Sequence, residues 1–89
     1  MKVDFSDIEL RPTLKGEPIH VDLTEVIAEQ VYQHARTLAA HKLALKIDAG
    51  KGKVDLDANE TKIVLGSILD LKYYAQIAIK HILGYEEEL

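Results

Sequence analysis

A glycine- and lysine-rich loop lies near the centre of the chain, in the run Ala49-Gly50-Lys51-Gly52-Lys53. Loops of this composition bind phosphate groups in some proteins, because backbone N–H groups and a lysine surround the anion. That chemistry requires a Gly-Lys-Ser/Thr sequence at the start of a helix, whereas here Gly52-Lys53 leads into the alternating segment Val54-Asp55-Leu56. The sequence therefore predicts a helix end followed by an exposed turn rather than a phosphate site.

Four histidines raise the question of a metal site: His20, His34, His41 and His81. On one helix, His34 and His41 would be separated by roughly 10 Å along the axis, which is too far for both to bind one ion. The chain has neither cysteine nor an HExxH pattern, which are common ligand signatures of zinc sites. We expect structural or solvent-facing histidines, with no metal and no cofactor.

Serine and carboxylate chemistry has equally little local support. Ser6 and Ser67 each carry a hydroxyl, but neither lies in the G-x-S-x-G turn that exposes a catalytic serine. Asp55 and Asp57 would share one face of a strand, yet Asp57 is explained more simply as a helix cap. We therefore expect that the protein is not an enzyme.

Charge is distributed unevenly along the chain, whose total is −4. Residues 34–53 carry five basic side chains and one acidic side chain, whereas the segments on both sides are acidic. Such a basic segment could contact phosphates and bind nucleic acid in a salt-dependent way. The total charge is negative, however, and no nucleic-acid-binding motif accompanies the basic residues. Nucleic-acid binding is therefore our alternative hypothesis, with contacts from Arg36, Lys42, Lys46, Lys51 and Lys53.

A tyrosine pair in the C-terminal part of the chain indicates a different kind of surface. Tyr73 and Tyr74 lie in a run with few charged residues, and tyrosine is favoured at protein interfaces. Alternatively, a tyrosine ring closes the edge of a core with few aromatic residues, and this interpretation fits Tyr74 best. Our leading hypothesis is a contact surface for protein partners, made of Tyr73, Tyr74, Ile77 and Lys80.

The composition is that of one small globular domain spanning residues 1–89. Hydrophobic residues make up 47% of the chain and aromatic residues 6%, so aliphatic side chains must build the core. The absence of cysteine excludes disulfides and thiolate chemistry. The N-terminus lacks the apolar core of a signal peptide, and no run approaches the roughly 20 apolar residues of a membrane span. We therefore expect a soluble cytoplasmic protein without membrane contact.

The N-terminal part of the chain has the alternating pattern of β-structure. Apolar and polar residues alternate in two segments, which predict a small hairpin or a pair of edge strands over residues 3–21. The run Leu14-Lys15-Gly16-Glu17-Pro18 has the composition of the turn between them.

A long amphipathic pattern follows the hairpin. Asp22 and Glu25 have the spacing of a capping box, and apolar residues then recur at helical spacing over residues 23–47. We expect a helix there, with a break near residues 37–40. Gly50 is placed to end this helix in a left-handed conformation.

The last third of the chain has the pattern of a short strand followed by a helix. Residues 53–56 alternate and are expected to pair as one more short strand, and Asp57 with Glu60 forms a second capping-box pattern. A long or divided helix is expected over residues 58–83. It has so few charged residues that either the rest of the chain or a second subunit must cover it, and we expect a homo-oligomer. The fold class is α+β, a short N-terminal β-hairpin plus two to three amphipathic helices.

The order of these signals resembles that of a group of small proteins encoded in tailed-phage and prophage genomes, mostly without an assigned function. The matching pieces are Leu14-Lys15-Gly16-Glu17-Pro18-Ile19, Leu23-Thr24-Glu25-Val26, Leu43-Ala44-Leu45-Lys46-Ile47 and Gly52-Lys53-Val54-Asp55-Leu56, followed by Glu60 and Ile63-Val64. The sequence departs from that pattern in lacking a proline near Tyr73-Tyr74. The resemblance implies no catalytic residues and favours a small accessory or assembly factor that acts on other proteins.

Overall fold

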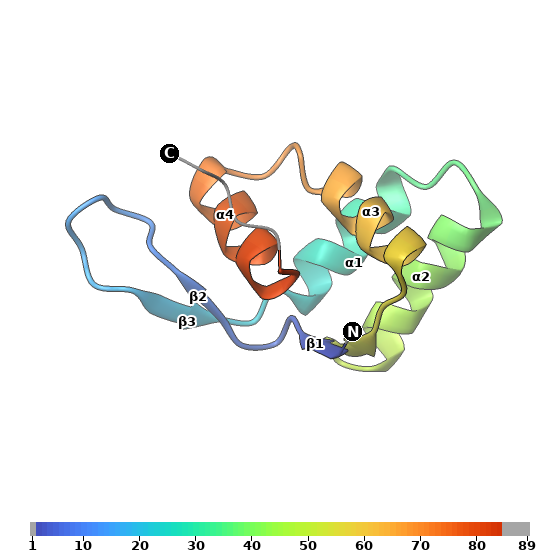
Figure 1. The fold of residues 1–89 in the computed structure, drawn as a ribbon, viewed down its shortest axis with the longest axis horizontal. Coiled ribbons are helices and arrows are strands. Elements are labelled where there is room, and N and C mark those ends of the chain that lie inside the picture. The colour runs from blue at the N-terminus through green and yellow to red at the C-terminus, as the bar shows by residue number, and fades with distance from the viewer. Residues whose placement is uncertain (1, 85–89) are drawn as a thin grey trace.

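The computed structural model describes residues 2–84. The α+β class expected from the sequence is confirmed: three short strands precede two helices, and a fourth strand precedes two more (Figure 1). In chain order, the elements are β1 (Lys2–Asp4), β2 (Ile8–Leu10), β3 (Ile19–Val21), α1 (Thr24–Gln33), α2 (Leu38–Ala49), β4 (Lys53–Asp55), α3 (Ala58–Ser67) and α4 (Tyr73–Ile82).

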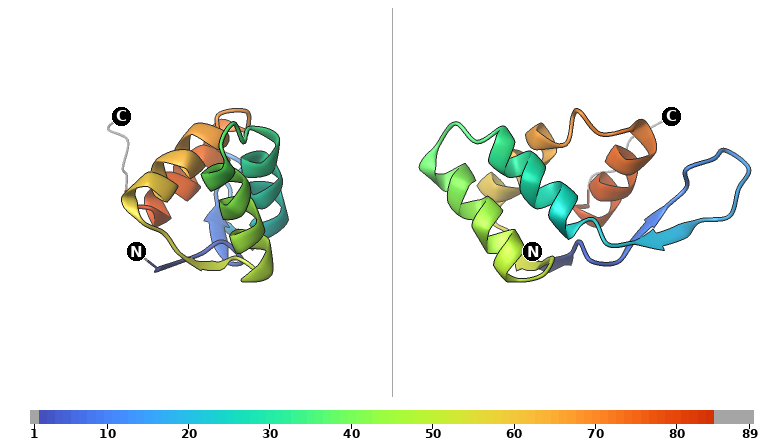
Figure 2. Two further views of the ribbon diagram at one scale, coloured as in Figure 1. Left: turned by 90° about the vertical axis from the view of Figure 1, so that its right-hand side faces the viewer. Right: turned by 180° about the vertical axis from the view of Figure 1, so that it is seen from behind.

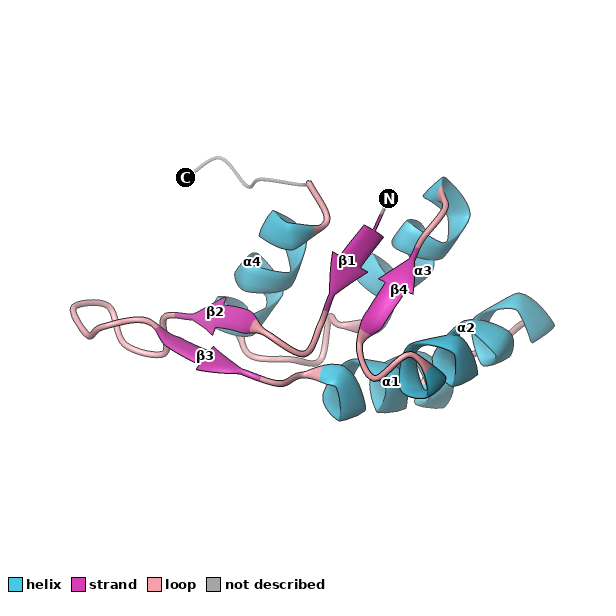
Figure 3. Ribbon diagram, turned by 90° about the horizontal axis from the view of Figure 1, so that it is seen from below, coloured by secondary structure: helices cyan, strands magenta, loops and turns pink. Residues whose placement is uncertain are grey.

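The strands pair in two separate antiparallel ribbons (Figure 3). β2 pairs with β3 in the predicted hairpin, with Leu10 opposite Ile19. β1 pairs with β4, with Val3 opposite Val54. This second ribbon confirms the strand expected at residues 53–56 and ties the N-terminal end of the described chain to the segment after α2.

The amphipathic pattern of residues 23–47 forms two helices, separated by the predicted break. α1 ends at Gln33 and α2 begins at Leu38. Thr37 caps α2, because its side-chain oxygen accepts a hydrogen bond from the backbone N–H of Ala40 at 3.2 Å. The short connection folds α2 back along α1, and the two helices lie side by side (Figure 2).

The start of α1 differs from the expectation. The capping box predicted from Asp22 and Glu25 is wrong, because Leu23 occupies the N-cap position and forms no side-chain cap. The Asp22 carboxylate instead accepts a hydrogen bond from the backbone N–H of Thr24 at 2.9 Å. Hydrogen bonding to Thr24 holds the pKa of Asp22 below its usual value.

The end of α2 differs in its conformation, although its position is confirmed. Gly50 is the C-cap residue, but its φ of −82° is not left-handed. The left-handed conformations fall on Lys51, with φ 54°, and Gly52, with φ 93°. Position 50 requires glycine for a steric reason: a Cβ there would collide with the backbone carbonyl oxygen of Lys53.

The second capping box is confirmed at the start of α3. The Asp57 carboxylate accepts from the backbone N–H of Glu60 at 2.7 Å, and the Glu60 carboxylate accepts from the backbone N–H of Asp57 at 3.0 Å. The long helix expected over residues 58–83 is divided, because α3 ends at Ser67 and α4 begins at Tyr73. Gly84, with φ 83°, follows the end of α4.

Replacing Asp57 with Ala should lower the free energy of unfolding by about 1 kcal/mol, because the backbone N–H of Glu60 loses its acceptor. Urea denaturation measures this change. Lys62→Ala, at an exposed position of the same helix, is the control and should change the stability by less than about 0.5 kcal/mol. Equal unfolding midpoints for the two variants would contradict a stabilising role for the cap.

The core lies between the α1–α2 pair, α3, α4 and the strands. Its side chains are aliphatic except for Phe5, as the composition predicted. β2 packs against α4, and Tyr74, Ala78 and Ile82 of this helix contact the core, so the chain itself supplies cover for the charge-poor helix. Among residues 2–84, no helix is both long and apolar enough to cross a membrane.

Candidate functional site

A surface groove of about 440 Å³ lies between α1 and α2. Its floor contains Ala28 and Ala44, which are buried. The small side chains at these two positions leave a hollow between the paired helices. The lining residues are Glu25, Ala28, Glu29, Tyr32, Ala44, Leu45 and Asp48.

Two large apolar side chains stand on opposite sides of this floor. Tyr32 of α1 is 53% exposed and Leu45 of α2 is 54% exposed. The Tyr32 ring lies 5.5 Å from the His41 ring between centroids, in a tilted arrangement that restricts its orientation. The groove therefore offers apolar surface to a ligand at its walls as well as at its floor.

Three carboxylates surround the apolar floor. Glu25 and Glu29 are one turn apart on α1, and Asp48 lies across the groove near the end of α2. All three are exposed, and none forms an ion pair within residues 2–84. The rim is therefore negative, and a ligand with positive charges would be attracted to it.

The contact surface expected on α4 is divided in the structure. Tyr74 contacts the core, in agreement with its interpretation as an edge of the core. Tyr73 is 59% exposed, whereas Ile77 and Lys80 are half-buried. Tyr73, Ile77 and Lys80 follow one another at helical spacing on one side of α4, so they form a smaller surface without Tyr74.

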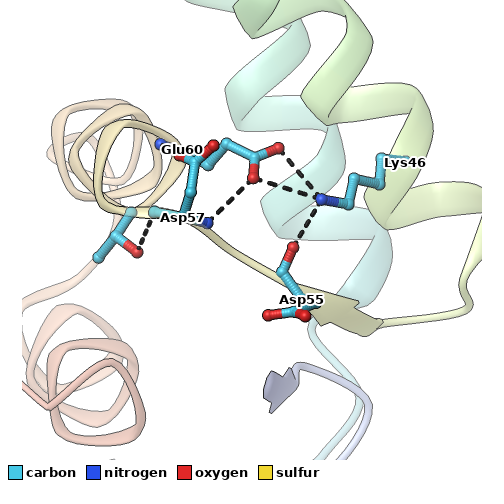
Figure 4. Close-up of polar contacts among 5 residues, drawn as sticks. Lys46, Asp55, Asp57 and Glu60 are labelled. Carbon is cyan, nitrogen blue, oxygen red and sulfur yellow. Dashed lines mark hydrogen bonds and ion pairs between the residues drawn. The ribbon is translucent and has the colours of Figure 1, made fainter. Parts of the chain in front are cut away.

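The basic residues of the alternative hypothesis are all exposed, and they are distributed over several elements. Lys42 and Lys46 lie on α2, and Arg36, Lys51 and Lys53 lie in the connection before it, in the turn after it and on β4. The Lys46 ammonium is engaged within the fold (Figure 4). It donates to the Asp55 carbonyl oxygen at 2.6 Å and to the Glu60 carboxylate at 3.2 Å. Lys46 therefore links α2 to β4 and α3, and nucleic-acid binding stays a prediction.

The glycine- and lysine-rich loop is a closed turn. Backbone N–H groups of this loop donate to carbonyl groups of the chain: Lys51 to Asp48, Gly52 to Ile47 and Lys53 to Gly50. Groups that donate internally do not point at an anion, so this geometry supports the turn rather than a phosphate site.

Two of the four histidines each contact a different aspartate. His20 contacts Asp7 at 2.8 Å and His34 contacts Asp70 at 2.9 Å, both through ring nitrogens. The placement of His34 and His41 on one helix is wrong, because the chain turns back between α1 and α2. Within the described part of the chain, no three His, Cys, Asp or Glu side chains are grouped to hold a metal ion.

The sequence-based interpretation missed the groove. The spacing of Glu25, Glu29 and Tyr32 is visible in the sequence, but these residues form a site only when Leu45 and Asp48 lie across from them. In comparisons with known proteins, no family model, no curated protein and no solved structure matches this chain.

Proposed function

We propose that this protein is a small non-enzymatic protein-interaction module that binds a segment of a partner protein in the groove between α1 and α2. The observation that carries this proposal is the combination of a buried alanine floor, two half-exposed apolar walls and three carboxylates that form no ion pair with other residues of the described range 2–84. Apolar contact supplies affinity at such a surface, and the charged rim selects the partner and speeds its association.

The shape of the groove limits the partner segment. Glu25 and Tyr32, at the two ends of the lining on α1, are separated by roughly 10 Å along the helix axis. This length fits the tip of a loop or about two turns of a helix. The matching chemistry is one apolar side chain between lysine or arginine residues, and so small an interface would bind weakly.

The wider role follows from this surface together with the resemblance to small phage and prophage proteins. We propose an accessory or assembly factor that acts in the cytoplasm, holds other protein chains and has no reaction of its own. Tyr73, Ile77 and Lys80 of α4 form a second surface of the same kind. Nucleic-acid binding is less favoured, because Lys46 is already held by Asp55 and Glu60.

Fluorescence anisotropy with labelled synthetic peptides tests the groove. A peptide with leucine between arginine and lysine should bind, whereas versions with serine for leucine or glutamate for the basic residues should not. The combined substitutions Glu25→Gln, Glu29→Gln and Asp48→Asn should weaken binding about tenfold, since each exposed charge contributes a fraction of a kcal/mol.

Glu9→Gln is the matched control, because this exposed carboxylate lies on β2 outside the groove. It should leave the affinity unchanged. NMR titration of the same peptide should shift the amide signals of Ala28 and Ala44, at the floor. Equal binding of all the peptides, or shifts confined to other elements, would overturn the proposal.

A further inference from the structure

We propose that the partner segment is the hairpin loop of a second copy of this chain, which places Leu14 in the α1–α2 groove of its neighbour. The hairpin loop is defined here as residues 11–18, between β2 and β3. This inference depends on the proposed function of the groove and names its occupant.

The hairpin loop presents one apolar side chain to solvent. It extends from the body of the molecule as an arm (Figure 1). Leu14 is 97% exposed, well above the other exposed large apolar side chains of the described chain. Arg11 and Lys15 are also exposed and lie on either side of it in the sequence. The loop thus carries a leucine between two cations, and with the exposed Glu17 its net charge is +1 (two basic residues and one acidic).

The composition of the loop restricts its conformation before any contact forms. The two prolines of the chain, Pro12 and Pro18, lie in it and fix the φ angles at both of its ends. Gly16 packs closely against Thr13, and a Cβ at position 16 would collide with the Thr13 hydroxyl oxygen. A restricted loop loses less conformational entropy on binding than a flexible one, so a small contact suffices for association.

The loop and the groove are complementary in both apolar surface and charge. Leu14 would cover the floor at Ala28 and Ala44, which offers apolar surface at the centre of the groove. Arg11 and Lys15 on the two sides of the leucine meet a rim formed by three carboxylates: Glu25, Glu29 and Asp48.

The contact must form between two molecules. The hairpin loop lies at one end of the longest dimension of the molecule, which is 41 Å, and α2 lies at the opposite end (Figure 1). The loop therefore cannot enter the groove of its own chain. Two copies exchange loops in a closed pair, or successive copies join head to tail.

Sedimentation equilibrium from about 10 µM to about 1 mM tests this self-association, since a small interface has affinities in that range. The protein should form species larger than a monomer as the concentration rises. Leu14→Ser should lower the association constant about tenfold or more, because the buried leucine surface is lost. Leu69→Ser is the matched control, since this leucine is 64% exposed in the connection between α3 and α4.

A charge exchange tests the pairing directly. Arg11→Glu with Lys15→Glu, and separately Glu29→Lys with Asp48→Lys, should each abolish self-association. An equimolar mixture of these two proteins should restore assembly, because opposite charges face each other again across the contact. All four positions are exposed, so circular dichroism should show that both variants are folded.

If the protein is a monomer at about 1 mM, the inference is overturned. It is also overturned if the protein self-associates but Leu14→Ser leaves this association intact, or if only Tyr73→Ala abolishes it. The peptide titration separates this failure from failure of the groove itself. If the protein is monomeric but the basic peptide still binds, the groove has another occupant and only the inference fails. If neither binding occurs, the proposed function fails as well.

Discussion

Replacing Gly52 with Ala should destabilise the protein by about 3 kcal/mol. The residue has a φ of 93°, a conformation that costs a side-chain-bearing residue roughly 1–2 kcal/mol. A Cβ at this position would also collide with the Thr24 hydroxyl oxygen and approach the backbone nitrogen of Ser6 to 2.8 Å. Relief of that overlap must move backbone atoms, which adds about 1–3 kcal/mol. The sum is a large part of the roughly 5–15 kcal/mol that stabilises a typical domain.

Gly66→Ala is the control for this measurement. Gly66 lies within α3 and has no atom within 4 Å of a Cβ built on it, so alanine there should raise the stability by up to about 1 kcal/mol. Urea denaturation should therefore shift the unfolding midpoint in opposite directions for the two variants. A Gly52→Ala midpoint within error of the parent protein would show that the turn relaxes freely.

Substitution of Gly52 should affect the stability strongly because separate parts of the chain meet at this residue. Its carbonyl oxygen accepts from the backbone N–H of Phe5 at 2.8 Å, and the Phe5 carbonyl oxygen accepts from the backbone N–H of Leu23 at 2.9 Å. These bonds join the turn after α2, the segment after β1 and the start of α1. They hold the beginning of α1 beside the end of α2, where Glu25 and Asp48 face each other across the groove.

Elements specified by a few neighbouring residues were predicted from the sequence. The Asp57–Glu60 capping box needs two side chains three residues apart, and it forms as expected. Of the hairpin expected over residues 3–21, the part from Ile8 to Val21 forms, as alternation and a loop rich in turn-forming residues indicate, whereas β1 pairs with β4. The break expected near residues 37–40 also forms, and the structure shows that Thr37 caps the second helix there.

Features that depend on contacts between distant segments were not predicted. Val54 was expected to pair, but nothing near it in sequence identifies Val3 as its partner. The Asp22 cap is wrong because Leu23, rather than Asp22, occupies the N-cap position of α1. The groove requires α2 to fold back along α1, and this arrangement is decided by the packing of Ile27, Leu43 and other core residues. Local periodicity carries no information on which exposed faces become neighbours.

Phe5 is the second position at which we expect a large effect. It is the only phenylalanine of the chain and has no exposed surface. Its backbone N–H and carbonyl group hydrogen-bond to Gly52 and Leu23, so the ring enters the core from the place where these segments meet. The other buried side chains of the core are aliphatic.

Phe5→Ala should therefore lower the free energy of unfolding by about 3–5 kcal/mol, the usual loss for a fully buried phenylalanine that leaves a cavity. Differential scanning calorimetry should record a decrease in the melting temperature of roughly 15 °C or more for a domain of this size. Leu38→Ala, at a position 66% exposed, should change it by only a few degrees. Phe5→Leu keeps most of the volume and should recover more than half of the loss. Equal melting temperatures for Phe5→Ala and Leu38→Ala would contradict the placement of the ring in the core. They would also contradict the role of the Gly52–Phe5–Leu23 contacts in holding α1 against α2.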